Sequence, residues 1–170
     1  MINSARQGGP PRIRANPEHS PSADVYADWP PTAAPATAGS SCCSCSITLP
    51  ATVGEVAEAR RFVAGFVNDP ALVDDAVLCV SELATNAVIH SNSRLAGGRF
   101  AVAAERYSDG HFRIMVLDRG GRWIERAKDG REHLGLMMVS RLASAWGVDG
   151  DGLHGRVVWF ELLPVPAPGT

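Results

Sequence analysis

The chain of 170 residues is long enough for one domain with extensions. Its formal net charge of −2, from 16 basic and 18 acidic residues, excludes the strongly basic surface typical of nucleic-acid-binding proteins. No run approaches the ~18 apolar residues of a membrane span, and the first thirty residues lack the apolar core of a secretory signal. These features predict a soluble, cytoplasmic protein that contacts neither nucleic acid nor membrane directly.

The four cysteines do not suggest a disulfide framework. Cys42, Cys43 and Cys45 form a cluster, and Cys79 lies in a long predicted helix. A disulfide framework needs pairs spread along a secreted chain, and a structural zinc site usually needs four ligands, of which the cluster offers three. We expect the cluster to be part of a linker without a special role, and Cys79 to be a small core or pocket-edge residue.

The first 45 residues differ in composition from the rest of the chain. They hold seven of the twelve prolines, are otherwise rich in Ala, Ser and Gly, and show no helical or strand periodicity. Such a segment buries too little apolar surface to become ordered by itself. We therefore predict a disordered extension over 1–45, a folded domain over 46–163 and a flexible tail over 164–170.

Within the folded domain, apolar runs predict strands and apolar residues at intervals of three and four predict helices. In chain order the expected elements are a strand at 46–50, helices at 53–67 and 70–91, strands at 100–106 and 112–117, a helix at 134–145, and strands that start at 146 and span 156–163. This order predicts an α+β fold, a two-layer sandwich with helices on one face of a mostly antiparallel mixed sheet.

The most informative stretch lies in the second helix, where Glu82, Asn86 and His90 recur at every fourth residue. At about 100° per residue, Asn86 and His90 lie about 40° and 80° from Glu82. The neighbouring arc is apolar and consists of Leu72, Ala76, Val80, Leu83, Ala84, Ala87 and Val88. The three polar side chains should therefore border the buried face, where a carboxylate and an amide can orient a metal ion or a nucleophile. Periodicity alone leaves a second interpretation open, namely surface polar residues beside a core.

Two further segments lie at element ends where a pocket could form. Asp118-Arg119-Gly120-Gly121 follows a buried strand; the carboxylate can accept a hydrogen bond from an exocyclic amine, and the glycines let a flat ring approach the backbone. Gly135 and Leu136 open the third helix, whose N-terminal N–H groups favour phosphate. Each signal alone also fits an ordinary turn or a packing glycine, and the order of all three favours a site.

These motifs resemble those of the GHKL, or Bergerat-fold, ATP-binding domains over residues 47–163. The closest resemblance is to the anti-sigma-factor serine kinases of the RsbW/SpoIIAB type. Residues 82–90 match the N box of that family, with its Glu-Leu-x-x-Asn-Ala-x-x-His pattern. Residues 116–120 match the G1 box, and residues 133–139 fall where the G2 box is expected.

The resemblance implies a role for each matched residue. Asn86 would coordinate a Mg²⁺ ion that bridges the phosphates of ATP, and Glu82 would be the general base. Asp118 would bind the adenine amino group. The other cofactor-binding residues implied are His90, Gly120, Gly135 and Leu136. These roles suit the preference of Mg²⁺ for oxygen ligands and a phosphoryl transfer that depends on positioning.

The family resemblance also implies partners. They are a sigma factor, which the protein would sequester, and a STAS-domain anti-anti-sigma factor, which it would phosphorylate on serine or threonine. The oligomeric state stays open, although members of the family are commonly dimers.

Two features depart from the family pattern. His133 stands where the first glycine of the G2 box is expected, and only sixteen residues separate Asp118 from Gly135, so the segment over the nucleotide is short. These departures favour an alternative, a non-catalytic protein-binding module of the same fold with weakened or lost ATP turnover. A third interpretation is an unrelated structural α+β domain.

Overall fold

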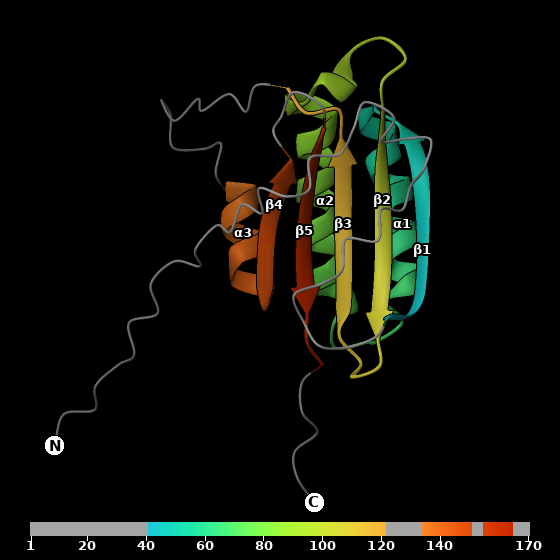
Figure 1. Ribbon diagram of the computed structural model, residues 1–170, viewed down its shortest axis with the longest axis vertical. Coiled ribbons are helices and arrows are strands. Elements are labelled where there is room, and N and C mark those ends of the chain that lie inside the picture. The colour runs from blue at the N-terminus through green and yellow to red at the C-terminus, as the bar shows by residue number, and fades with distance from the viewer. Residues whose placement is uncertain (1–40, 122–133, 151–154, 165–170) are drawn as a thin grey trace, which may run out of the picture.

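The computed structural model describes residues 41–121, 134–150 and 155–164. The described elements run along the chain as a strand, two helices, two strands, a helix and two strands, with two short 3-10 helices between them (Figure 1). In order they are β1 (Ser41–Pro50), the 3-10 helix η1 (Val53–Glu55), α1 (Val56–Phe66), α2 (Val73–His90), the 3-10 helix η2 (Asn92–Arg94), β2 (Arg99–Tyr107), β3 (Phe112–Asp118), α3 (Leu134–Leu142), β4 (Ala145–Gly150) and β5 (Arg156–Leu162).

The five strands form one sheet in the order β1-β2-β3-β5-β4. All four pairings between neighbouring strands are antiparallel, so the described part of the sheet has no parallel pair and is not mixed. The helices lie behind the sheet in Figure 1, which makes two layers. The predicted α+β sandwich with helices on one face is confirmed.

The start of the sheet corrects the predicted domain boundary. We expected order to begin at Ser46, but β1 begins at Ser41 and pairs with β2 from Ser41 opposite Tyr107 to Pro50 opposite Arg99, with one register shift between Ser41 and Cys43. Cys42, Cys43 and Cys45 therefore lie in an edge strand and not in a linker. Most side chains of β1 are exposed. Backbone pairing with β2, rather than an apolar side-chain pattern, stabilises the strand here.

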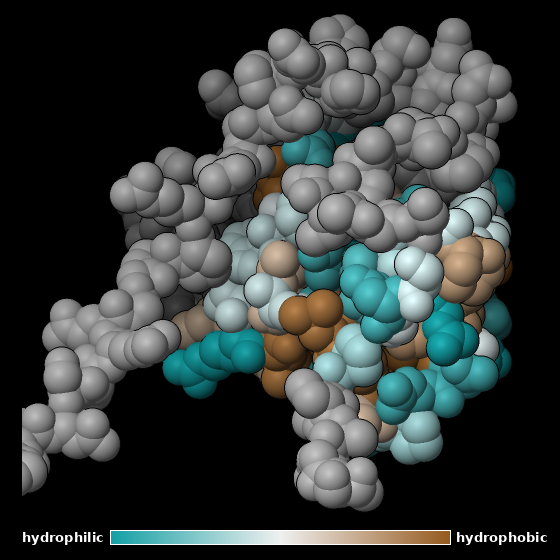
Figure 2. Space-filling view, turned by 60° about the horizontal axis from the view of Figure 1, so that its bottom comes forward, coloured by the Kyte–Doolittle hydropathy of each residue, from teal (hydrophilic) through white to brown (hydrophobic). Residues whose placement is uncertain are grey.

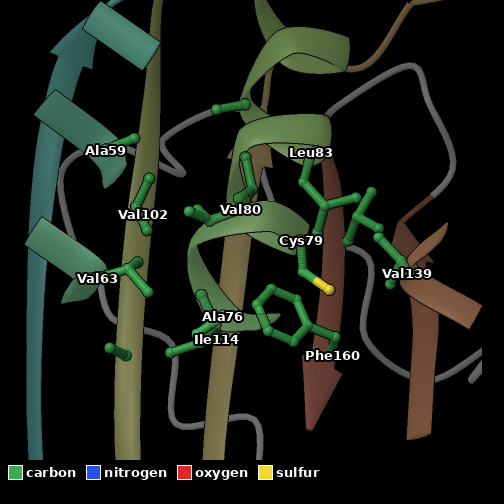
Figure 3. Close-up of a cluster of buried hydrophobic side chains, with 14 of the residues drawn as sticks. Ala59, Val63, Ala76, Cys79, Val80, Leu83, Val102, Ile114, Val139 and Phe160 are labelled. Atoms are coloured by element: carbon green, nitrogen blue, oxygen red, sulfur yellow. The ribbon is translucent and has the colours of Figure 1, made fainter. Parts of the chain in front are cut away.

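The core lies between the helices and one face of the sheet. Alternate strand residues point to opposite faces, and the helix-facing set includes Val102 on β2, Ile114 on β3 and Phe160 on β5, all fully buried. Figure 3 shows these side chains meeting those of α1, α2 and α3, namely Ala59, Val63, Ala76, Cys79, Val80, Leu83 and Val139. The predicted apolar arc of the second helix is confirmed, since each of its members is buried.

The opposite face of the sheet is also buried near its centre, at Ala101, Ala103, Met115 and Leu117. Side chains of neighbouring strands contribute to the burial of this face. The guanidinium carbon of Arg113 lies 4.3 Å from the ring centroid of Trp159, and Arg113 forms a cross-strand pair with Glu161, with 3.8 Å between Nη1 and Oε1. Trp159 in turn lies so close to Gly147 that a Cβ there would approach Cζ2 of the indole to 2.6 Å.

The lower end of the molecule in Figure 1 carries the β2–β3 hairpin and is brought forward in Figure 2. Hydrophobic and hydrophilic residues are interspersed on the described surface in that view. A hollow of about 360 Å³ is lined by Asn68, Asp69, Phe112, Pro164 and neighbouring residues. Phe112 begins β3 and Asp118 ends it, so this hollow lies at the opposite end of the sheet from Asp118.

Helices α2 and α3 approach each other closely at a glycine. A Cβ on Gly135 would lie 2.5 Å from Oε2 and 3.3 Å from Cβ of Glu82. Only glycine therefore fits at position 135, in the first turn of α3, without displacing the Glu82 side chain. The contact brings two sequence motifs, 53 positions apart, to one place.

The first prediction concerns the core. Phe160→Ala should lower the free energy of unfolding by about 3–5 kcal/mol, because it removes a fully buried ring from a packed core. Leu95→Ala is the control, since Leu95 is 58% exposed and its loss should change the free energy by less than about 0.5 kcal/mol. Urea denaturation followed by circular dichroism measures both. Similar small losses for the two variants would contradict the assigned core.

The second prediction compares two helical glycines. Gly65→Ala should raise the free energy of unfolding by up to about 1 kcal/mol, because a Cβ there meets no other atom within 4 Å and alanine favours the helix. Gly135→Ala should gain less, or lose stability, since Glu82 must move to admit the methyl group. Parallel urea titrations give the comparison. An equal gain at both positions would show that α3 does not pack against Glu82 as described.

Candidate functional site

Helix α2 places Glu82 and Asn86 at the border of its buried face. Both side chains are half-buried, as the helical spacing predicts. Their neighbours Leu83 and Ala87 are buried against the sheet, which fixes the rotation of the helix about its axis. His90 is exposed, so the expectation that it also borders the buried face is wrong. It is the last residue of α2, and no further helical turn flanks it.

A buried thiol lies one turn before Glu82. Cys79 is fully buried among core side chains, as expected. Burial, followed by the negative charges of Asp75 and Glu82, raises the pKa of Cys79 to about 12. The thiol therefore stays protonated and unreactive at neutral pH.

Asp118 ends β3 on the helix-facing side of the sheet. It has the same strand parity as Ile114 and Val116, which belong to the core between sheet and helices. Its side chain is 3% exposed, and Oδ1 accepts a hydrogen bond of 2.7 Å from the backbone N–H of Gly120. Gly120 has a φ of 63°, a left-handed conformation that favours glycine. The chain therefore turns sharply just after the carboxylate.

Asp118 is paired with an arginine that the sequence analysis did not single out. Arg156 begins β5 directly opposite Asp118 in the strand register. Its Nε lies 3.2 Å from Oδ2, and its Nη2 lies 3.2 Å from Oδ1 and 3.0 Å from Oδ2. Arg156 is itself only 6% exposed. Pairing the two strands from their apolar patterns would have revealed this contact, because the register places both residues on one face.

Burial is the main influence on the charge of Asp118. It raises the pKa of this carboxyl to about 6, against the opposing effects of the Arg156 charge, the Arg156 hydrogen bonds and the Gly120 N–H. The carboxylate is therefore mostly ionised at pH 7 and mostly protonated below pH 6.

The loop after Asp118 is tied to the end of α2 by hydrogen bonds. The backbone N–H of Asn92 donates to the carbonyl of Gly120 at 2.8 Å, and the backbone N–H of Arg119 donates to Oγ of Ser93 at 3.0 Å. Gly121 follows with a φ of 106°, and a Cβ there would lie 2.8 Å from Oδ1 of Asn92. These hydrogen bonds therefore hold the turn after β3 and the turn after α2 together.

Gly135 and Leu136 lie in the first turn of α3, whose described part begins at Leu134. Leu136 is half-buried and packs against the core, so its side chain anchors the start of the helix. Gly135 contacts Glu82, which joins the first and third motifs of the sequence. His133 and the segment between β3 and α3 fall outside the described residues.

Two negative findings hold for the described ranges. No group of three or more His, Cys, Asp or Glu side chains there is placed to hold a metal ion. Of the helices in those ranges, none combines the length and apolar character of a membrane span.

Comparison with known proteins agrees with this geometry. The model of the histidine kinase-like ATPase domain family matches residues 49–161, which is about two thirds of the chain. A search of curated proteins finds no significant match.

Two solved structures share the fold. The structure of the RsbU and RsbW domains of Rv1364c from Mycobacterium tuberculosis matches with a TM-score of 0.58 and 25% identity; the match covers 71% of this chain and 32% of that one. The chain thus spans about a third of that protein's crystallised length. The SiaB-SiaC complex from Pseudomonas aeruginosa matches with a TM-score of 0.53 and 15% identity, covering 69% of this chain and 88% of that one. The family match, over a sheet and helices that carry the expected motifs, shows that the chain belongs to the histidine kinase-like ATPase domain family.

Proposed function

We propose that the protein binds ATP and phosphorylates a serine or threonine of a STAS-domain anti-anti-sigma factor, and that it sequesters a sigma factor when unoccupied by that partner. The observation that carries the proposal is the family match together with contacts that join each of the other two motifs to α2 or to the turn after it. Glu82 lies against Gly135, and the turn after Asp118 is hydrogen-bonded to the turn after α2. We place the protein in the cytoplasm, where a sigma factor acts.

Asp118 is the proposed acceptor for the amino group of adenine. It is buried at the end of β3, where an N–H···O⁻ hydrogen bond is stronger than in water. Gly120 and Gly121, with their positive φ values, keep side chains away from the ring. Gly135 and the start of α3 offer backbone N–H groups to phosphate. We assign only a peripheral role to His90, which is exposed at the end of α2.

The residues present fit a Mg²⁺ ion held mainly by the nucleotide. Mg²⁺ keeps several waters and takes one or two protein oxygens plus phosphate oxygens, so the lack of a carboxylate cluster in the described residues is compatible with it. Asn86 would supply its amide oxygen, and the ion would neutralise phosphate charge. Glu82, one turn earlier and half-buried, would accept the proton of the attacking hydroxyl.

A second candidate function is a non-catalytic binding module of the same fold. One observation favours it: the carboxylate meant for adenine already accepts hydrogen bonds from Arg156 and Gly120. In such a module the site would bind nucleotide weakly, and the protein surface would bind partners without phosphoryl transfer. The two candidates differ in turnover, which the following experiments measure.

The third prediction concerns nucleotide binding. Isothermal titration calorimetry with ATP and Mg²⁺ should show binding by the unmodified protein. Asn86→Ala should weaken it at least tenfold when Mg²⁺ is present, and Asp118→Ala should weaken it with or without the ion. Asn68→Ala is the control, because Asn68 is exposed beside the hollow at the other end of the sheet. Absence of binding by the unmodified protein would overturn the proposed function.

The fourth prediction concerns phosphoryl transfer. With radiolabelled ATP, the protein should transfer phosphate to a cognate STAS-domain partner. Glu82→Gln should reduce the rate at least a hundredfold, because it removes the base, while ATP binding stays within a few-fold of that of the unmodified protein. Binding of ATP without transfer to any STAS-domain partner encoded beside sigma factors would favour the non-catalytic module.

A further inference from the structure

We propose that Arg156 is a positioning residue for base recognition: it keeps the Asp118 carboxylate ionised and in one orientation, ready to accept a hydrogen bond from the amino group of the base. This inference rests on the proposed function, in which Asp118 binds adenine. It assigns a role to a residue that lies outside the three sequence motifs.

The contacts of Asp118 fix the direction of its carboxylate. A carboxylate offers about four acceptor positions. Three donor nitrogens make four hydrogen bonds to it in the described structure: Oδ1 accepts from the backbone N–H of Gly120 and from Nη2 of Arg156, and Oδ2 accepts from Nε and Nη2 of Arg156. Because Nη2 is shared between the two oxygens, the amino group of a base would take the place of one of its two bonds. A base amino group would therefore meet an acceptor whose orientation is fixed before binding.

The pair is held by the sheet and not by flexible loops. Asp118 and Arg156 are cross-strand partners at the ends of β3 and β5, and both side chains are more than nine-tenths buried. The planar guanidinium contacts both carboxylate oxygens, which a lysine ammonium cannot reproduce. Rotation of the carboxylate would break these bonds in a buried place where water cannot replace them.

Few other charges surround the carboxylate among the described residues. On β2 the helix-facing neighbour is Phe100, and on β4 the residue opposite Arg156 is Gly150. The turn η2 contributes the uncharged Asn92 and Ser93 and the exposed Arg94. Arg119, directly after Asp118, is also exposed, and the charge that acts on the pKa of Asp118 is that of Arg156. The titratable groups on the adjoining part of α2 are Glu82, which lies against Gly135, and the exposed His90. Arg156 is therefore the main positive charge that opposes the effect of burial on Asp118.

Removal of Arg156 could act in two opposite directions. It would free acceptor positions on Asp118, which would tighten binding if the arginine competed with the base. It would also leave a buried carboxylate without its cation, which favours protonation and weakens the acceptor. Because burial already raises the pKa of Asp118 to about 6 with Arg156 in place, we expect the second effect to dominate at pH 7.

The fifth prediction tests this with Arg156→Met. Its dissociation constant for ATP at pH 7 should rise about tenfold, the size of one lost charge-assisted hydrogen bond. For the unmodified protein, binding should weaken below about pH 6. For Arg156→Met the same weakening should begin about two pH units higher, which matches a tenfold loss of affinity at pH 7, and the two proteins should converge above about pH 9. Because the terminal phosphate of ATP also titrates near neutral pH, the difference between the two profiles is the quantity that counts.

Arg113→Met is the matched control. Arg113 is also a buried strand arginine paired with a cross-strand carboxylate, Glu161, but it lies on the other face of the sheet. Its loss should lower stability without moving the pH profile of ATP binding. Circular dichroism confirms folding of each variant. If Arg156→Met does not fold, Arg156→Lys replaces it, with an expected smaller loss of affinity and a smaller shift of the profile.

The outcomes separate the two proposals. Absence of ATP binding by the unmodified protein would overturn the proposed function. ATP binding by Arg156→Met or Arg156→Lys with an unchanged profile, or with higher affinity at all pH values, would overturn the role of Arg156. Carboxyl NMR of the nucleotide-free proteins follows Asp118 directly, and an unchanged titration midpoint in the variant would also overturn it.

Discussion

The close packing of α2 on the sheet is the constraint on which the candidate site depends. The buried face of α2 is built from small residues, chiefly Ala76, Ala84 and Ala87, with Val80 and Leu83 between them. Small side chains let the helix axis approach the strands, and the interlocking larger ones fix its rotation. Glu82 and Asn86 thereby come to the border of the contact with one orientation. On a less closely packed helix, the side chains of Glu82 and Asn86 would not point in one defined direction.

The ion pair of the candidate site lies at the ends of two strands whose middles are apolar. Asp118 ends β3 and Arg156 begins β5, directly beyond the last core side chains. This arrangement puts one ion pair into a place that water scarcely reaches, at the border of a core that is otherwise uncharged. A buried pair of this kind contributes little net stability, because desolvation offsets attraction. Its presence is easier to understand as a requirement of the site than as a requirement of the fold.

Much of the architecture could be predicted from the sequence because apolar residues recur at regular helical intervals in the helices. The buried arc of α2 was predicted residue by residue, and the fold class was predicted from the order of the elements. The strands β2 and β3 are buried on both faces, so their continuous apolar runs revealed strands but not which residues face the helices. The extra residues of β1 could not be predicted, since its exposed serines and cysteines form a strand only through the partner strand β2.

The candidate site was predictable where a motif lies within one element, and less so where two elements meet. Glu82, Asn86 and Asp118 were found by pattern and resemblance. Arg156 was missed because its importance comes from the register between two strands separated by 38 positions in sequence. His90 was placed wrongly because a helical wheel takes no account of where the helix ends.

The contact between Glu82 and Gly135 couples two proposed tasks: phosphate binding at the start of α3 and proton acceptance by Glu82. Any ligand that orders the start of α3 also restricts the side chain against which that helix rests. By thermodynamic linkage the coupling must be reciprocal, so in the proposed function the conformational freedom of Glu82 would contribute to the free energy of phosphate binding. A partner protein that pulls α3 away from α2 would then weaken nucleotide binding and displace the proposed base in a single motion.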